Sequence, residues 1–406
     1  MVAHQQSPYF GFGKTSLLPQ EEMLELNQKQ AKLVIGIPKE VKRFESRVAL
    51  TPESVEVLVR NGHELYIESG AGEAANYSDR DYSECGGIII EEKERVFQCD
   101  IILKIAPLTL ENIDLLRGNQ VILSSLHFTN QTESYIRKLM QKRVTAVAFE
   151  TLKDKENCYP VIRSMSEIAG TASILIAAEY LSNVNQGKGV LLGGISGITP
   201  AEVVILGAGT AAESAARAAL GLGAHIKVFD ESIGRLKRIQ THLRQPIYTS
   251  VYHPKVLQKD LASADVVIGA VHHGERGARY FITEEMVQTM KEGAVIVDLS
   301  IDQGGCLETS RCMSHVDPVY VKYGVIHYCV PNVPSRVART ASIALSNVFT
   351  PLLMEIAEAG GLKRILRDHM GLRHGVYLYN GLLTSQQIGK HFGIPSKDID
   401  LLMAAF

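Results

Sequence analysis

One stretch indicates the fold class, Val203-Val204-Ile205-Leu206-Gly207-Ala208-Gly209-Thr210-Ala211-Ala212. In it an apolar strand runs directly into the pattern G-x-G-x-x-A and then into an alanine-rich helix. Gly207 permits the tight turn, and Gly209 lacks a Cβ, so the backbone there can approach a pyrophosphate. Ala212 lets the helix pack closely on the strand, while the helix N-terminus attracts the anion. The stretch predicts a parallel βαβ unit that binds a dinucleotide.

An acidic residue follows this unit at an informative distance. The second predicted strand, 226–229, ends in Asp230, which comes 23 positions after Gly207 (230 − 207). A carboxylate at this point can hold both hydroxyls of an adenosine ribose and would repel a 2′-phosphate. No arginine follows it immediately. Strand, glycines, helix, second strand and acid together predict NAD as the cofactor, although a glycine turn in an ordinary βαβ unit remains the other interpretation.

Two further strands extend the same series. We expect them at 264–271 and 294–298, and the second runs into the turn 299–305, which contains Asp302. The carboxyl ends of parallel strands share one edge of the sheet. Asp302 is therefore predicted to lie at the edge that binds the cofactor, although an aspartate in such a sequence more often only forms a turn.

The part of the chain before this series alternates in the same way. Short β-rich apolar runs alternate with amphipathic, helix-length stretches, which is typical of parallel βαβ units. The predicted strands are 33–37, 64–67, 101–103, 121–124 and 145–148, and the predicted helices are 52–60, 109–116 and 131–142.

The two series indicate an α/β protein with two domains. The helical pattern 165–181 and the glycine-rich segment 186–200 lead into the second series, and a long helical pattern, 340–359, follows it. We therefore predict a Rossmann-type parallel-sheet NAD domain inserted into a second α/β domain that binds the substrate. The predicted boundaries are 1–32 for an N-terminal extension with a helix over 19–32, 33–160 and 336–406 for the substrate domain, and 161–335 for the NAD domain.

Composition excludes several other classes of protein. The chain has 406 residues and a formal net charge of −2, without a long Lys/Arg cluster, so nucleic acid is not an expected partner. Its six cysteines form no CxxC pair and none has zinc-ligand spacing with a histidine, which predicts no metal and fits a reducing compartment. No signal-peptide pattern is present, and the most apolar stretch, 169–181, looks too short to span a bilayer. We therefore expect a cytoplasmic protein without a membrane partner.

Three basic or titratable residues lie where chemistry could use them. Arg47 precedes the helix start at Thr51-Pro52 and could bind a carboxylate through two hydrogen bonds. Lys104 ends the strand 101–103, and His127 follows the strand 121–124. Each alone has an ordinary explanation, namely a surface arginine, a lysine that reaches solvent and a histidine that caps a helix. Together with Asp302 they predict an active site around the cofactor.

Over about residues 33 to 395 the chain resembles alanine dehydrogenase, within the larger group that includes the nicotinamide nucleotide transhydrogenase alpha subunit. The motifs occur in the order and spacing of that family. They are Gly36-Ile37-Pro38-Lys39-Glu40, Arg47-Val48-Ala49-Leu50-Thr51-Pro52, Gly70-Ala71-Gly72-Glu73, Leu103-Lys104, Leu126-His127, Met165-Ser166-Glu167-Ile168-Ala169-Gly170, 203–209 and Ile301-Asp302-Gln303-Gly304-Gly305-Cys306.

The resemblance implies a reaction and a role for each candidate. It implies reversible, NAD-dependent oxidative deamination of L-alanine to pyruvate and ammonia. Arg47 and Lys104 would hold the carboxylate and carbonyl of pyruvate, His127 would polarise the carbonyl and exchange a proton, and Asp302 would assist proton transfer. Histidine suits this role because it exchanges protons near neutral pH.

The resemblance also implies further cofactor contacts and an oligomer. Ser166 and the stretch around Asn332 would contact NAD in addition to Gly207, Gly209, Ala212 and Asp230. The chain would form a homo-oligomer, and a hexamer is the expected size. The long helix over 340–359, with many small and apolar residues, is one possible interface.

Several positions near the substrate depart from the family pattern and leave two alternatives open. They are Ser125, Ala106, the loop that begins His272-His273, and the stretch Val333-Pro334-Ser335-Arg336 after Asn332. The two histidines could line the cofactor cleft, but a surface loop is the favoured interpretation. Ala106-Pro107 favours a transhydrogenase-like hydride-donor domain, whereas His127 and the complete Ile301–Gly305 motif speak against it. The second alternative is a regulatory protein that binds NAD without catalysis.

Overall fold

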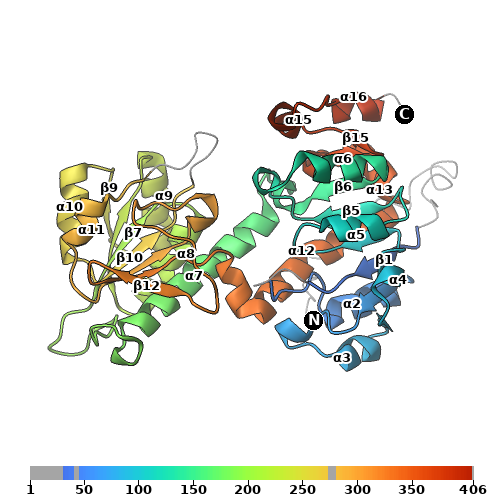
Figure 1. The fold of residues 1–406 in the computed structure, drawn as a ribbon. Coiled ribbons are helices and arrows are strands. Elements are labelled where there is room, and N and C mark those ends of the chain that lie inside the picture. Colours follow the sequence, from blue (N-terminus) through green and yellow to red (C-terminus); the bar gives the residue numbers. More distant parts are fainter. Residues whose placement is uncertain (1–30, 41–44, 273–279, 405–406) are drawn as a thin grey trace, which may run out of the picture.

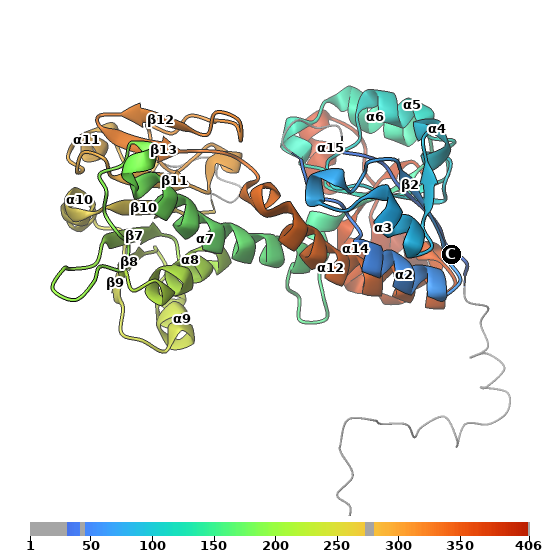
Figure 2. The same ribbon diagram turned by 90° about the horizontal axis from the view of Figure 1, so that it is seen from below.

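The computed structural model describes residues 31–40, 45–272 and 280–404. Two lobes, each built around its own sheet, are joined by two long helices that pack against each other, α7 (Pro160–Leu181) and α12 (Ala338–Glu358) (Figures 1 and 2). Most of the predicted helix 19–32 lies outside the described residues.

The first lobe contains an eight-stranded sheet in the order β15-β14-β6-β5-β4-β1-β2-β3. Strands β1 to β6 pair in parallel, whereas β14 from the end of the chain pairs antiparallel with β6. Most of the central strands are Ile-, Leu- and Val-rich because helices cover both faces of a mostly parallel sheet. The strands are β1 (Val34–Ile37), β2 (Glu64–Glu68), β3 (Ile88–Ile90), β4 (Ile101–Leu103), β5 (Val121–Ser124), β6 (Thr145–Ala148), β14 (Val376–Tyr379) and β15 (Leu382–Leu383).

Several helices of this lobe begin where a side chain caps them. Thr109 forms a capping box with Asn112, and the Thr132 hydroxyl accepts from the Tyr135 N–H, so both helices start just inside the predicted bounds. The helices are α2 (Pro52–Arg60), α3 (Asp79–Glu84), α4 (Lys93–Val96), α5 (Leu110–Leu115), α6 (Glu133–Gln141), α13 (Leu362–Asp368), α14 (Met370–Gly375), α15 (Gln386–Phe392) and α16 (Ile399–Ala404).

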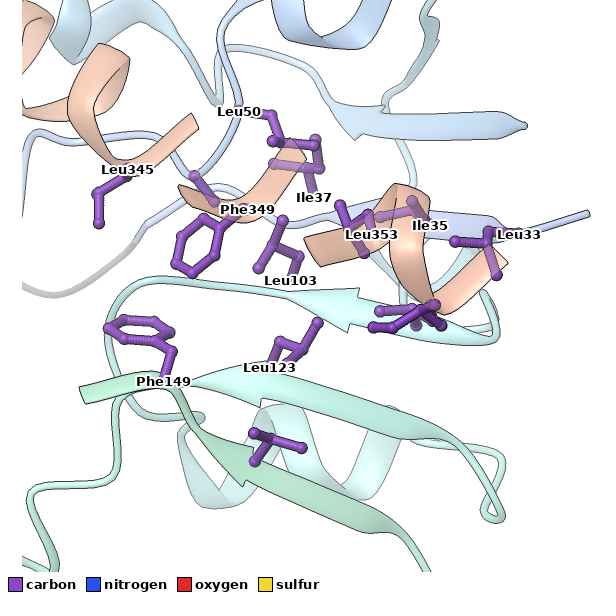
Figure 3. Close-up of a cluster of buried hydrophobic side chains, with 14 of the residues drawn as sticks. Leu33, Ile35, Ile37, Leu50, Leu103, Leu123, Phe149, Leu345, Phe349 and Leu353 are labelled. Carbon is purple, nitrogen blue, oxygen red and sulfur yellow. The ribbon is translucent and has the colours of Figure 1, made fainter. Parts of the chain in front are cut away.

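Helix α12 supplies much of the core of the first lobe. Its residues Leu345, Phe349 and Leu353 are fully buried against strand residues such as Leu103 (Figure 3). The rings of Phe349 and Phe149 lie 5.2 Å apart between centroids. A segment more than 300 residues from β1 therefore completes the core on which the β1–β6 sheet rests.

The second lobe contains a seven-stranded sheet in the order β12-β13-β11-β10-β7-β8-β9, which is parallel except for β12. Read from β9 to β13, this is the strand order of a doubly wound dinucleotide-binding fold, with its switch point between β7 and β10. The predicted α/β fold with a Rossmann-type sheet is confirmed. The elements are β7 (Glu202–Leu206), α8 (Thr210–Gly221), β8 (His225–Phe229), α9 (Ile233–Leu243), β9 (Tyr248–Ser250), α10 (Pro254–Ser263), β10 (Val266–Gly269), α11 (Glu284–Gln288), β11 (Val295–Asp298), β12 (Val319–Lys322) and β13 (Val325–Tyr328).

The connecting helix α7 is longer than expected, since it begins at Pro160 rather than at residue 165. By length and composition alone, two described helical stretches could cross a membrane, Pro160–Leu181 and Val333–Glu358. The expectation that 169–181 is too short is thus wrong about the length. Both helices are nevertheless core helices, since α7 buries Val161 in the first lobe and Ile174 in the second. At Gly170 a Cβ would lie 2.1 Å from the Ala211 carbonyl oxygen, so glycine permits the close crossing of α7 and α8.

Candidate active site

The glycine turn after β7 has the geometry that its sequence predicts. Gly207 has φ +100°, and a Cβ there would lie 2.3 Å from the Ala270 carbonyl oxygen, so no larger residue fits without a shift. Gly209 caps α8 in an extended conformation, and a Cβ there would meet no atom within 4 Å. Ala212 is fully buried. The turn leaves the N-terminus of α8 accessible to an anion.

Asp230 lies directly beside this turn, at the end of β8. It is buried, its Oδ2 accepts from the Ala208 N–H at 2.8 Å, and its Oδ1 accepts from the Ser232 N–H at 2.8 Å. The first turn of α9 brings Arg235 back toward it, with 3.9 Å between Arg235 Nη1 and Asp230 Oδ2. Sequence spacing alone did not reveal this arginine, because its approach depends on the turn between β8 and α9.

Ser166 approaches the same helix end from α7. It lines a cavity of about 920 Å³ together with Thr210, the first residue of α8, and Arg238. Arg238 Nη2 donates to the Ala208 carbonyl at 3.0 Å, which fixes its guanidinium beside the turn. Backbone donors, a hydroxyl and a positive charge around a helix N-terminus fit a pyrophosphate, and Asp230 fits the adenosine ribose.

In the first lobe, Arg47 is held by the carboxylate of Glu45, which stands two residues before it in the sequence. Its Nε and Nη2 donate to the two carboxylate oxygens of Glu45 at 2.7 and 2.6 Å, while Nη1 lies 3.3 Å from Met165 Sδ. Asn332 of the second lobe donates to Glu45 Oε2 at 3.1 Å. Burial raises the pKa of Glu45, but the charge and hydrogen bonds of Arg47 outweigh it and hold that pKa below its usual range. Glu45 thus links Arg47 and Asn332 across the two lobes.

Lys104 is also paired with a glutamate. Its Nζ contacts Glu40 Oε2, and the two side chains are only 1% and 7% exposed. Glu40 also accepts from the Ile105 N–H at 2.7 Å. Burial raises the pKa of Glu40, and the Lys104 charge opposes this shift. Lys104 is therefore a buried cation rather than a lysine that reaches solvent.

His127 follows β5 in an unusual backbone conformation. It has φ 45° and ψ 55°, which is left-handed, and its side chain is exposed. Its N–H donates to Glu150 Oε1 at 3.1 Å, and the preceding N–H of Leu126 donates to the same oxygen at 2.8 Å. The ring is not the cap of the following 3₁₀ helix, since no side-chain cap bond forms there. That ordinary explanation for His127 is not what the structure shows.

Asp302 lies in the short 3₁₀ helix Ile301–Gln303 that follows β11, and it is exposed. Strands β11 and β7 both pair in parallel with β10, which lies between them. Asp302, after β11, and the glycine turn, after β7, therefore lie at the same edge of the sheet. The neighbouring Gln303 Nε2 lies 2.9 Å from Nδ1 of His272, which is exposed. His273 lies outside the described residues. His272 therefore contacts the motif that contains Asp302, beside the predicted cofactor edge.

The fold brings the candidates together in three groups. Lys104 and His127 follow the adjacent parallel strands β4 and β5 and share that sheet edge, while Arg47 and Asn332 meet at Glu45. Asp302 lies with the glycine turn in the other lobe. Sequence reasoning missed Glu40, Glu45 and Glu150, although Glu40 stands in one of the quoted motifs and Glu45 two residues before another.

One group of possible metal ligands occurs among the described residues, formed by Asp154, Glu156 and Cys158 within 4.8 Å of one another. Asp154 Oδ1 accepts from the N–H groups of the other two at 2.9 and 2.8 Å, so a turn in the loop explains their closeness. Both acids are exposed. We therefore assign no metal site to these three residues.

Comparison with known proteins identifies the family. The model of the alanine dehydrogenase/PNT N-terminal domain matches residues 36–169, and that of the alanine dehydrogenase/PNT C-terminal domain matches residues 173–386. The chain belongs to the alanine dehydrogenase/PNT family. The expected resemblance, the dehydrogenase class and NAD as the cofactor of the family are thereby confirmed.

Individual relatives align with this chain over nearly their whole length. The alanine dehydrogenase of Staphylococcus saprophyticus is 37% identical over 369 residues, which cover 91% of this chain and 99% of the relative. The alanine dehydrogenase of Methanococcus maripaludis is 37% identical over 365 residues, which cover 89% of this chain and 97% of the relative. A solved L-alanine dehydrogenase superimposes with a TM-score of 0.83 at 35% identity, covering 88% and 99%. A transhydrogenase from Sinorhizobium meliloti superimposes with a TM-score of 0.74 at 23% identity, covering 87% and 99%, which shows a shared fold.

Proposed function

We propose that this protein catalyses the reversible, NAD-dependent oxidative deamination of L-alanine to pyruvate and ammonia. The observation that carries the proposal is the pair of basic side chains in the first lobe, Arg47 and the buried Lys104, each fixed by its own glutamate. A small 2-oxo or 2-amino acid offers a carboxylate and a polar group that this pair can bind. Two alanine dehydrogenases, each 37% identical over about nine tenths of the chain, support the choice of alanine.

Each candidate residue has a role in this reaction. Arg47 binds the substrate carboxylate through Nη1, because Glu45 occupies its Nε and Nη2 edge. Lys104 binds the oxygen or nitrogen at C2. NAD⁺ held by the second lobe would supply the acceptor for the hydride of the substrate α-carbon. His127 takes the proton that the amino group loses, returns protons as water adds to the imine and ammonia leaves, and Asp302 assists the exchange.

The cofactor side of the site is assigned to the second lobe. Gly207, Gly209 and Ala212 form the pyrophosphate turn, Asp230 binds the adenosine ribose, and Ser166 and Asn332 complete the contacts. The N–H groups at the start of α8 and the accessible face above Gly209 support this assignment.

An absorbance assay of the pyridine nucleotide tests the proposal. Purified protein should reduce NAD⁺ with L-alanine and oxidise NADH with pyruvate only when ammonium is present. A transhydrogenase-like hydride donor would instead be inactive with both pairs and would pass hydride only to a second nucleotide-binding domain. A regulatory protein would bind NADH without turnover in any arm. Either of these two results would overturn the proposal.

We expect a strong preference for NAD over NADP, because a 2′-phosphate would lie close to the buried Asp230 carboxylate. Like charges about 4 Å apart repel by about 4 kcal/mol at an effective dielectric of 20, so kcat/KM should favour NAD by about 10²–10³-fold. Asp230→Ser should relax the preference, since Arg235 is then free to meet the phosphate. Asp230→Ser with Arg235→Ala is the matched control and should recover less NADP activity. Comparable kcat/KM for both cofactors in the wild type would contradict this expectation.

We further propose the domain boundaries 33–160 with 336–406 for the substrate domain and 161–335 for the NAD domain. The pairing of β14 with β6 and the burial of α12 in the first lobe support the return of the chain to that domain.

We also propose a cytoplasmic homo-oligomer, with a hexamer as its expected size. Light scattering at micromolar concentration should give about six times the 44.5 kDa mass of one chain, and a monomeric mass would refute the oligomer.

A further inference from the structure

Glu150 contacts the backbone of the proposed catalytic histidine from a neighbouring strand. It lies in the 3₁₀ turn Phe149–Thr151, directly after β6, which pairs in parallel with β5. One oxygen, Oε1, accepts from two successive N–H groups, those of Leu126 and His127, at 2.8 and 3.1 Å. Hydrogen bonds to a charged acceptor are about twice as strong as those between neutral groups.

The left-handed backbone of His127 needs such support. A residue other than glycine in this region costs on the order of 1 kcal/mol or more, and it persists only where surrounding contacts hold it. Other contacts of the loop hold its carbonyl groups, since Asn130 N–H donates to the His127 oxygen at 2.8 Å and Gln131 Nε2 to the Leu126 oxygen at 2.9 Å. Glu150 holds the N–H groups of the same two residues.

The second oxygen of Glu150, Oε2, is buried and makes no hydrogen bond to another described residue. The buried hydroxyl groups of Tyr135 on α6 and Tyr377 on β14 lie close enough for the Glu150 charge to act on both. Burial raises the pKa of both tyrosines well above the usual value, and the Glu150 charge adds to the effect. Both phenols are therefore neutral polar groups of the core close to the Glu150 carboxylate.

We propose that Glu150 is a positioning residue for the reaction, which fixes the peptide of His127 so that the imidazole reaches the substrate. The inference rests on the proposed function, because it assigns Glu150 a role only through His127. It separates two tasks in the first lobe. Arg47 and Lys104 bind the substrate, whereas Glu150, through the Leu126 and His127 N–H groups, sets where the proton-transfer group lies.

Three variants of the full-length protein test this role. Glu150→Ala should lower kcat by about 10–100-fold, since a misplacement of about 1 Å can cost 10²-fold, while the KM for pyruvate and the Kd for NADH change less than about twofold. Glu150→Gln should retain activity within about threefold, because its amide oxygen can accept from both N–H groups. Glu156→Ala removes an exposed acid from the following loop and is the charge-matched control, with expected wild-type rates.

A double variant separates positioning from a general loss of stability. In a His127→Ala background, Glu150→Ala should reduce the remaining rate less than about twofold, because residues that act as one unit are not additive. An additive loss, or wild-type kcat in Glu150→Ala, would overturn the inference. Amide hydrogen exchange gives a readout without turnover, since the Leu126 and His127 amides should exchange faster in Glu150→Ala. Unchanged exchange would refute the role, whereas absent alanine turnover in the wild type would refute only the proposed function.

Discussion

Replacing His127 by alanine should lower kcat by about 10²–10⁴-fold, the usual loss when a general acid/base is removed. The Kd for NADH should stay within a few-fold of the wild type, because the proposed nucleotide contacts lie on the second lobe. Steady-state assays with pyruvate, ammonium and NADH, together with NADH binding and the thermal midpoint, measure all three effects on one preparation.

The matched control is His127→Asn. Asparagine tolerates the left-handed backbone that His127 adopts at φ 45°, so this variant keeps the loop and removes only the imidazole. We expect both variants to lose turnover equally, with a smaller change of the thermal midpoint in His127→Asn. A variant that keeps more than about a tenth of wild-type turnover would argue against the role, which would then pass to Asp302 or Lys104.

Most of the fold could be predicted from local pattern. The run Ile101–Leu103 and the strand that leads into Gly207 are apolar, short and bounded by turn residues, so periodicity identifies them. The partner of β6 could not be predicted in this way, because β14 comes more than 220 residues later and its pairing is a tertiary choice. The short strand Ile88–Ile90 was also missed; it lies at the edge of the sheet, and only Ile90 of its three residues is buried.

The placement of the candidate site residues was predictable to the same extent. Lys104 and His127 stand at the ends of parallel strands, and that position is visible in the sequence. The carboxylates that fix them were not visible as partners, because Glu40 is 64 residues from Lys104 and Glu150 is 23 residues from His127. A charged or titratable residue next to a strand end indicates a candidate site. The carboxylate that fixes this residue depends on which chain segment packs beside the strand, and the sequence does not show that.

Replacing Lys104 by methionine should destabilise the protein and also reduce its activity. The change leaves the Glu40 carboxylate buried without its cation, which typically costs about 3–5 kcal/mol, and a large domain loses about 2–4 °C per kcal/mol. The thermal midpoint at pH 8 should therefore fall by about 10 °C. The kcat/KM for pyruvate should fall as well, because the proposed ligand of the C2 substituent is gone.

The loss should depend on pH. Burial already raises the pKa of Glu40, and removal of the opposing Lys104 charge raises it further. Because the folded-state pKa then lies above the unfolded value, the folded protein binds this proton more tightly than the unfolded chain. The resulting stabilisation is present at low pH and is lost as pH rises through the folded-state pKa. Lys104→Met should thus be closer to the wild type in thermal midpoint at pH 5 than at pH 8.

The double variant Lys104→Met/Glu40→Gln separates the structural from the substrate-binding role of Lys104. Methionine and glutamine replace both partners of a buried ion pair by neutral groups of similar size, which is often nearly neutral for stability. The double variant should therefore recover most of the thermal midpoint at pH 8 while its kcat/KM for pyruvate stays as low as that of Lys104→Met. Recovery of activity together with stability would show that Lys104 serves only to neutralise Glu40. A double variant as unstable as Lys104→Met would show that the unpaired carboxylate is not the cause of the loss.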